Sequence, residues 1–346
     1  MSIFIAILIF SIIILFHELG HFLLAKANGI RVNEFSLGLG PTLIGFTKGE
    51  TKYSLKLLPF GGACMMEGED ESSSDSHAFG NKSVWARISV VFAGPFFNFI
   101  MAFVFAVILI CSIGFDIPRI SGVVEGYAAE EAGLQGGDII TEINGKNIYF
   151  YRQVSNYTLF HPGEPMEIVY ERDGVEHETT LIPKYVEEEQ RYLYGFYSPS
   201  EREQTGFFKT IVYAFHEVGY NITTTIDSLK LLLGGGVSVN DLSGPVGIVS
   251  SIGSTYQESV EESGYYYAFL NMVNWTILLS ANLGVMNLLP IPALDGGRLV
   301  FLILEAIRGK AIDQDKEGMI HTVGILLLLA LMVVVLFNDI RKVFFM

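Results

Sequence analysis

The chain has 346 residues, of which 50% are hydrophobic and 17% are charged, and its formal net charge is −15. Soluble domains carry about 25% charged residues, so this composition argues against an ordinary cytosolic enzyme and against a disordered protein. The acidic balance also argues against a nucleic-acid partner, because nucleic-acid binders present a basic face.

Four apolar stretches predict four transmembrane helices, each long enough to cross a hydrocarbon core of about 30 Å. They lie at residues 1–28, 85–114, 265–310 and 318–338. The first has no basic residue before Lys26, so we interpret it as a retained membrane helix and not as a signal peptide. The predicted fold class is a polytopic α-helical membrane protein with β-rich segments between its helices.

The segment between the first two helices, residues 29–84, predicts a β-hairpin followed by an acidic linker. Apolar residues alternate with polar or small ones at Phe35–Leu39 and again at Tyr53–Leu57, which is typical of short strands joined by a turn. Gly61 and Gly62 follow the second strand. Because they lack a side chain, they would let the backbone of a partner approach closely.

Residues 115–186 predict a small β-rich domain. We expect a strand at Ile120–Val124, a short helix at Ala128–Leu134, a hairpin-like pair at 137–140 and 142–145, and a strand from Met166 to a turn at Asp173–Gly174. The run Ala132–Ile140, followed by Ile143-Asn144-Gly145, resembles a PDZ domain. That resemblance implies either peptide capture by strand addition or a steric filter. A β-domain without a ligand is the alternative.

Residues 187–264 predict an amphipathic region, because apolar residues recur at helical spacing from Phe207 to Leu233. Such a helix is expected to lie at a membrane surface. Residues 116–262 hold 23 acidic and 9 basic residues, so they carry nearly all of the net charge. Basic residues instead gather after the first and third helices, which predicts that those two loops are cytoplasmic and that the acidic segment is extracytoplasmic.

The first predicted helix carries the motif His17-Glu18-Leu19-Gly20-His21. Spacing of i, i+4 puts both imidazoles on one helical face, where they can chelate a divalent ion, with Glu18 placed to act on a bound water. The alternative is a pair of ordinary histidines. An apolar helix disfavours that alternative, because burying two imidazoles and a carboxylate without partners costs several kcal/mol.

A catalytic zinc takes three protein ligands, and Asp295 is the candidate for the third. It lies where Pro290 and Pro292 break the third apolar stretch, so the chain can turn its side chain inward. The alternative is that Asp295 caps a helix that begins near Arg298.

Over essentially its whole length, the chain resembles the bacterial site-2 proteases, which are intramembrane zinc metalloproteases. The resemblance is carried by the PDZ-like insert and by four motifs, His17–His21, Ala93–Asn98, Leu242–Gly247 and Asn287–Gly297. It implies Zn²⁺ held by His17, His21 and Asp295, with Glu18 as general base. It also implies that the hairpin dips into the membrane, that Gly61 and Gly62 pair with substrate, and that Asn282 and Asn287 hold the substrate backbone.

The same resemblance implies partners and a location. The substrates would be transmembrane proteins, either anti-sigma factors or signal-peptide remnants, cleaved within the bacterial cytoplasmic membrane. The active site would lie near the cytoplasmic side and the PDZ-like domain outside.

Two functions from other classes stay open at this point. A PDZ-type membrane scaffold with a structural zinc would need a closed site of four ligands, and Cys64 is the candidate for the fourth. A metal transporter would need several acids or histidines strung through its helices.

Overall fold

The computed structural model describes residues 2–69, 73–198, 202–235 and 243–345. It contains two compact units, one formed by Met1–Phe105 together with Val237–Met346 and the other by Ala106–Gly236. Leu242 of the predicted Leu242–Gly247 motif and residues 70–72 of the acidic linker lie outside the described residues.

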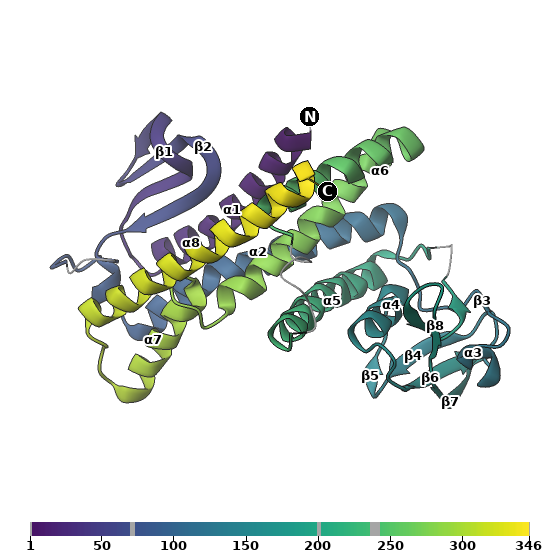
Figure 1. Cartoon of the computed structure of the whole chain (residues 1–346). Coiled ribbons are helices and arrows are strands. Elements are labelled where there is room, and N and C mark those ends of the chain that lie inside the picture. The colour runs from purple at the N-terminus through teal and green to yellow at the C-terminus, as the bar shows by residue number, and fades with distance from the viewer. Residues whose placement is uncertain (1, 70–72, 199–201, 236–242, 346) are drawn as a thin grey trace. The chain divides into compact units, whose positions relative to one another are not determined.

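Four helices in the described residues are long and apolar enough to cross a membrane. They are α1 (Ser2–Ala27), α2 (Val84–Ile113), α6 (Pro245–Leu288) and α8 (Gln314–Phe345), all labelled in Figure 1. The predicted polytopic helical fold is therefore confirmed. A short 3₁₀ turn at Phe79–Asn81 precedes α2.

The third predicted helix, 265–310, differs from the structure at its far end. Gly264 has φ 82° and ψ 174° and interrupts α6, so a new helix does begin at the predicted Tyr265. It ends at Leu288 because Pro290 and Pro292 cannot continue the helical hydrogen bonds. The chain then starts a separate helix, α7 (Asp295–Arg308). The predicted segment 265–310 thus contains two helices, separated at the prolines that mark the predicted break.

Strands β1 (Val32–Lys48) and β2 (Thr51–Met66) form the predicted hairpin, with its turn at Gly49. The two long strands fold back on themselves, since residues 34–37 of β1 pair with residues 52–55 on one side and with 62–65 on the other. Apolar side chains stay uncovered along the hairpin, among them Leu43, Ile44 and Phe46, which are 57%, 68% and 62% exposed.

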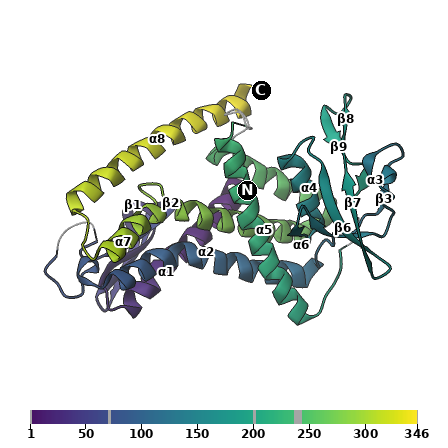
Figure 2. The ribbon, with the colours of Figure 1, turned by 90° about the horizontal axis from the view of Figure 1, so that it is seen from below.

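Ion pairs between half-buried side chains fix α7 within the first unit. Arg87 of α2 pairs with Glu305, and Arg298 pairs with Glu69, which follows β2. Figures 1 and 2 show that α7 and α8 meet at one end of the unit, and that α8 then runs back along it.

A buried carboxylate joins the end of α8 to the start of α6. Asp339, 1% exposed, accepts hydrogen bonds from the backbone N–H groups of Gly244 and Gly247, both at 2.9 Å. The first N–H groups of a helix have no partner within the helix and favour an anion. A Cβ on Gly244 would lie 2.4 Å from Val335 Cγ1, so this close junction requires glycine.

The second unit contains the predicted β-rich domain. Its main sheet has the strand order β5-β4-β6-β7. The elements are β3 (Gly122–Val123), α3 (Ala128–Glu131), β4 (Ile139–Ile143), β5 (Lys146–Asn147), α4 (Tyr151–Phe160), β6 (Met166–Arg172), β7 (Val175–Leu181), β8 (Lys184–Val186), β9 (Arg191–Leu193) and β10 (Phe196–Tyr197). Ile120, Ile140, Met166 and Leu181 are fully buried in its core.

Two details of this domain differ from the prediction. Residues 137–140 and 142–145 do not form a pair, because 139–143 is the single strand β4. The Asn144-Gly145 turn, with φ 46° and 73°, leads instead into β5. The predicted end at residue 186 also excludes β10, although β10 pairs with β3. The β-rich domain therefore extends to Tyr197.

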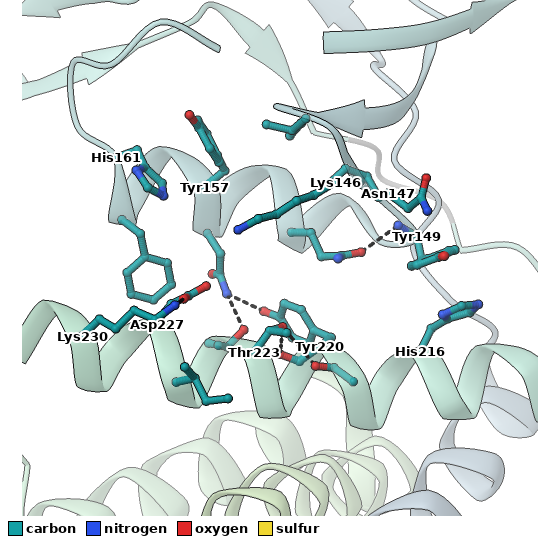
Figure 3. Close-up of a pocket in the computed structure, with 18 of the residues that line it drawn as sticks. Lys146, Asn147, Tyr149, Tyr157, His161, His216, Tyr220, Thr223, Asp227 and Lys230 are labelled. Atoms are coloured by element: carbon teal, nitrogen blue, oxygen red, sulfur yellow. Dashed lines mark hydrogen bonds and ion pairs between the residues drawn. The ribbon is translucent and has the colours of Figure 1, made fainter. Parts of the chain in front are cut away.

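Helix α5 (Phe207–Leu233) packs against α4 within the second unit. Arg152 of α4 pairs with Glu217 of α5, whose side chain is 2% exposed. Burial raises the pKa of Glu217, although Arg152 opposes this effect. Next to this pair, Asn156 donates a hydrogen bond to Tyr220 Oη at 2.9 Å. A cavity of about 510 Å³ opens between the two helices (Figure 3).

Candidate active site

The two histidines of the motif face the same side of α1, as their spacing predicts. Both are 8% exposed, and their Nε2 atoms lie 3.2 Å apart. The rings are nearly perpendicular, at 86°. Two nitrogen donors of one membrane helix therefore converge on one point.

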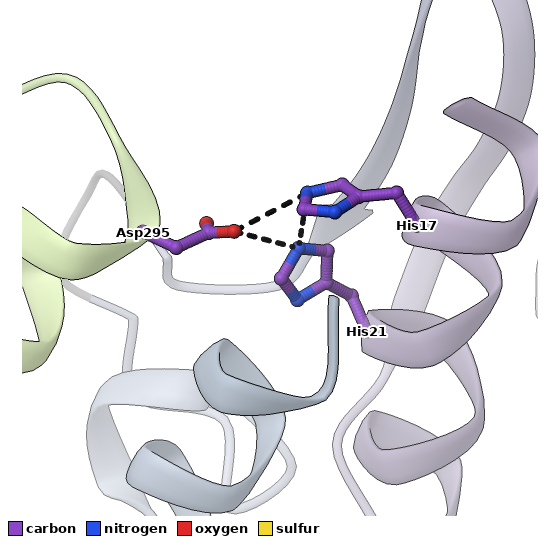
Figure 4. A group of neighbouring side chains, drawn as sticks. All are labelled: His17, His21 and Asp295. Atoms are coloured by element: carbon purple, nitrogen blue, oxygen red, sulfur yellow. Dashed lines mark hydrogen bonds and ion pairs between the residues drawn. The ribbon is translucent and has the colours of Figure 1, made fainter. Parts of the chain in front are cut away.

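Asp295 of α7 completes the cluster shown in Figure 4. Its Oδ2 atom lies 3.2 Å from His17 Nε2 and 3.5 Å from His21 Nε2. Asp295 is the first residue of α7, whose N-cap position is Leu294, and no side chain caps this helix end. The capping alternative for Asp295 is thus not what the structure contains.

The three donor atoms fit a metal ion. Zinc bonds of about 2.0–2.1 Å at tetrahedral angles separate neighbouring donors by about 3.3 Å, and the three separations here are 3.2, 3.2 and 3.5 Å. Asp295 Oδ2 is buried and has no hydrogen-bond donor among the described residues. A cation bound between Asp295 Oδ2 and the two imidazole nitrogens would satisfy this buried carboxylate oxygen.

Groups on α2 contact the far nitrogen of each ring. His21 Nδ1–H donates to the carbonyl of Val90 at 2.9 Å, which leaves the Nε2 lone pair of His21 free to face Asp295. The amide nitrogen of Asn98 lies 3.2 Å from His17 Nδ1, while the buried Asn98 Oδ1 has no partner among the described residues. Turning the amide over lets Oδ1 accept the Nδ1–H proton of His17 in the same way.

Glycines allow α2 to approach the histidines this closely. A Cβ on Gly94 would lie 2.3 Å from His21 Nε2 and 2.8 Å from His17 Cε1. A Cβ on Gly20 would lie 2.3 Å from the carbonyl oxygen of Ala93. The motif Ala93–Asn98 therefore forms the second wall of the site.

Glu18 lies against the end of β2. It is half-buried, and a Cβ on Gly62 would lie 2.9 Å from its Cγ atom. Cys64 is two residues further on and buried, but it is not part of the cluster found among the described residues.

The other predicted site residues lie on β2 and at the end of α6. Gly61 has φ 83° and faces Leu39 of β1, since a Cβ there would lie 3.0 Å from Leu39 Cγ. Asn282 and Asn287 are half-buried in the last two turns of α6, before the loop that leads to Asp295.

Sequence reasoning did not assign roles to three residues that the structure places at the site. Gly94 and Asn98 were noted only as part of a motif. No pattern in the sequence marks His321, yet its Nδ1 accepts a hydrogen bond from the Ala293 N–H at 3.0 Å. The spacing of Gly94 and Asn98, i and i+4 on one helical face, was the available signal for that pair.

Known proteins give an independent comparison. The sequence matches the family model of peptidase family M50 over residues 5–331. A protein of Clostridium acetobutylicum with a provisional zinc metalloprotease name is 38% identical over 339 residues, covering 98% of this chain and 97% of that protein. The regulator of sigma-W protease RasP of Bacillus subtilis is 31% identical, covering 98% of both chains. Its alignment spans 431 positions, more than this chain holds.

Among solved structures, a PDZ domain of an SdrC-like protein from Listeria monocytogenes matches 24% of this chain and 86% of its own, at 18% identity and a TM-score of 0.22. The family match and the full-length relatives agree with the four membrane helices of the structure. This chain belongs to peptidase family M50, the site-2 protease family, and is a multi-pass membrane zinc metalloendopeptidase.

Proposed function

We propose that the protein hydrolyses peptide bonds within transmembrane segments of other membrane proteins, using zinc held by His17, His21 and Asp295. The observation that supports this proposal is the convergence of three donor atoms within 4.8 Å of one another. The two nitrogen donors belong to α1, which is apolar enough to span a membrane. When bound, zinc supplies Lewis acidity, which polarises a carbonyl group and makes a water acidic near neutral pH.

Glu18 is the proposed general base. Its carboxylate takes a proton from the attacking water and returns it to the leaving amine. A Cβ on Gly62 would lie 2.9 Å from the Glu18 Cγ atom. Glu18 is therefore next to the strand that we propose holds the substrate, which supports this role.

The end of β2 is the proposed substrate-binding strand. A transmembrane helix shields its peptide bonds with its own hydrogen bonds, so the substrate must unwind before cleavage. An extended segment added beside Gly61 and Gly62 would recover those bonds through backbone pairing. Asn282 and Asn287 of α6 are proposed to hold the other side of the substrate backbone. The exposed apolar side chains of the hairpin support its insertion into the membrane.

The proposed location is the bacterial cytoplasmic membrane, with the active site near the cytoplasmic side and the β-rich domain outside. The distribution of basic residues supports this orientation. The name of the Bacillus subtilis relative, a regulator of sigma-W protease, supports anti-sigma factors as the substrate class, with signal-peptide remnants as the other class. The β-rich domain is proposed to select these substrates, either by binding a peptide or by steric exclusion.

The test is the Glu18→Gln variant. It should keep its zinc, because Glu18 is not a proposed ligand, but cleave about 100- to 10,000-fold more slowly, as expected when a general base is lost. Proteomics of membrane fragments that accumulate with this variant would identify the substrates. Glu261→Gln, an exposed position on α6, is the matched control. Normal fragment turnover by Glu18→Gln would contradict the mechanism and favour a scaffold with a structural metal.

A further inference from the structure

The loop that presents Asp295 has an unusual backbone. Ala293, two residues before Asp295, has φ 83° and is one of four non-glycine residues with positive φ in the described chain. L-residues with a Cβ disfavour this region, so such a conformation persists only when the surrounding structure holds it. The contacts that stabilise the backbone of Ala293 are therefore relevant to the direction of the Asp295 carboxylate.

Helix α8 supplies that hold. His321 Nδ1 accepts the Ala293 N–H at 3.0 Å. One turn further along α8, a Cβ on Gly324 would lie 2.5 Å from the carbonyl oxygen of Pro292. His321 and Gly324 are three residues apart and lie on the same face of α8. Together they contact two successive loop residues, Ala293 and Pro292.

The chemistry of His321 fits an acceptor. An imidazole that accepts at Nδ1 carries its proton on Nε2, and Glu317 Oε1 lies 3.9 Å from that Nε2 atom. The ring also packs on Phe301 of α7, with centroids 5.8 Å apart. A polar side chain within a membrane span is disfavoured unless it satisfies another group, and here it satisfies the N–H of a loop that has left helical geometry.

We propose that His321 is a positioning residue for Asp295. By accepting the Ala293 N–H it stabilises the left-handed backbone at Ala293 and so aims the carboxylate at His17 and His21. The inference rests on the proposed function only in taking Asp295 as a ligand of the metal.

Three single substitutions separate acceptor chemistry from packing. His321→Leu removes the acceptor. His321→Asn places an amide oxygen near the position of Nδ1, whereas His321→Gln places it nearer the position of Nε2. Zinc dissociation constants of the full-length chains in detergent are measured by competition with a chelator, and Co²⁺ absorption spectra report the ligand geometry.

We expect His321→Leu and His321→Gln to bind zinc about 10- to 100-fold more weakly, the range found for partners of metal ligands. His321→Asn should stay within about threefold of the wild type and keep its Co²⁺ spectrum. A purely structural role would not distinguish Asn from Gln. Equal zinc affinity of the Asn and Gln variants would therefore overturn the proposal, and this comparison remains usable if His321→Leu does not fold.

A second substitution tests the backbone directly. Glycine adopts positive φ readily, so Ala293→Gly should restore zinc affinity to His321→Leu at least in part. No restoration would count against the proposal. If Asp295→Asn loses zinc while His321→Leu does not, only the positioning role is wrong. If neither variant loses zinc, the metal site itself is wrong.

Discussion

Replacing Gly94 with alanine adds one methyl group at the face of α2 that touches the histidines. That methyl carbon would lie 2.3 Å from His21 Nε2, where ordinary contact begins at 3.4 Å. Relief requires a shift of about 1 Å by the ring or by α2. A shift of α2 would also lengthen the 2.9 Å bond between His21 Nδ1 and the carbonyl of Val90. Either way, His21, a proposed metal ligand, moves.

Overpacking by a methyl group costs about 1–3 kcal/mol. If the bound state bears that cost, zinc affinity falls about 5- to 150-fold. The assay is chelator competition on full-length protein in detergent, with zinc content measured by elemental analysis. Gly318→Ala on α8 is the matched control, because a Cβ there meets no atom within 4 Å. Equal zinc affinity of the two variants would refute the reasoning.

Three further substitutions test separate parts of the structure. Asn98→Leu keeps the volume but removes the acceptor for His17, so zinc affinity should fall about 10- to 100-fold in the chelator assay; an unchanged value would remove Asn98 from the site. Asp295→Asn should lose most of its bound zinc by elemental analysis, and full zinc content would exclude it as a ligand. In the β-rich domain, burial opposes ionisation of Asp138, but hydrogen bonds from Arg172 outweigh it and hold the pKa of Asp138 below its ordinary value. The stability this pair adds is therefore present above about pH 4, the ordinary carboxyl pKa, and is lost as pH falls further. Amide hydrogen exchange in β4, corrected for intrinsic rates, should therefore become faster below about pH 4. The Arg172→Met variant should already exchange faster than the wild type at pH 7. Identical pH profiles for the wild type and the variant would contradict this.

The sequence was sufficient to predict the parts of the site that depend on local geometry. The i, i+4 spacing of His17 and His21 fixes their shared face whatever packs against it, and prolines mark the break before Asp295. The contacts of Gly94, Asn98 and His321 depend on how helices pack, so no local pattern gives them. Helix α4 was not predicted, because Tyr151–Phe160 contains tyrosine, threonine and valine, which are weak helix formers.

The supports supplied by α8 have a consequence for biosynthesis. Helix α1, which contains His17 and His21, is synthesised early. The N–H of Gly244 can bond to Asp339, and the N–H of Ala293 to His321, only after α8 has been synthesised. A chain still being translated contains His17 and His21 but lacks the α8 contacts that we propose position Asp295. Completion of the last helix, and not synthesis of the His-Glu motif, is therefore the step at which the catalytic unit becomes whole.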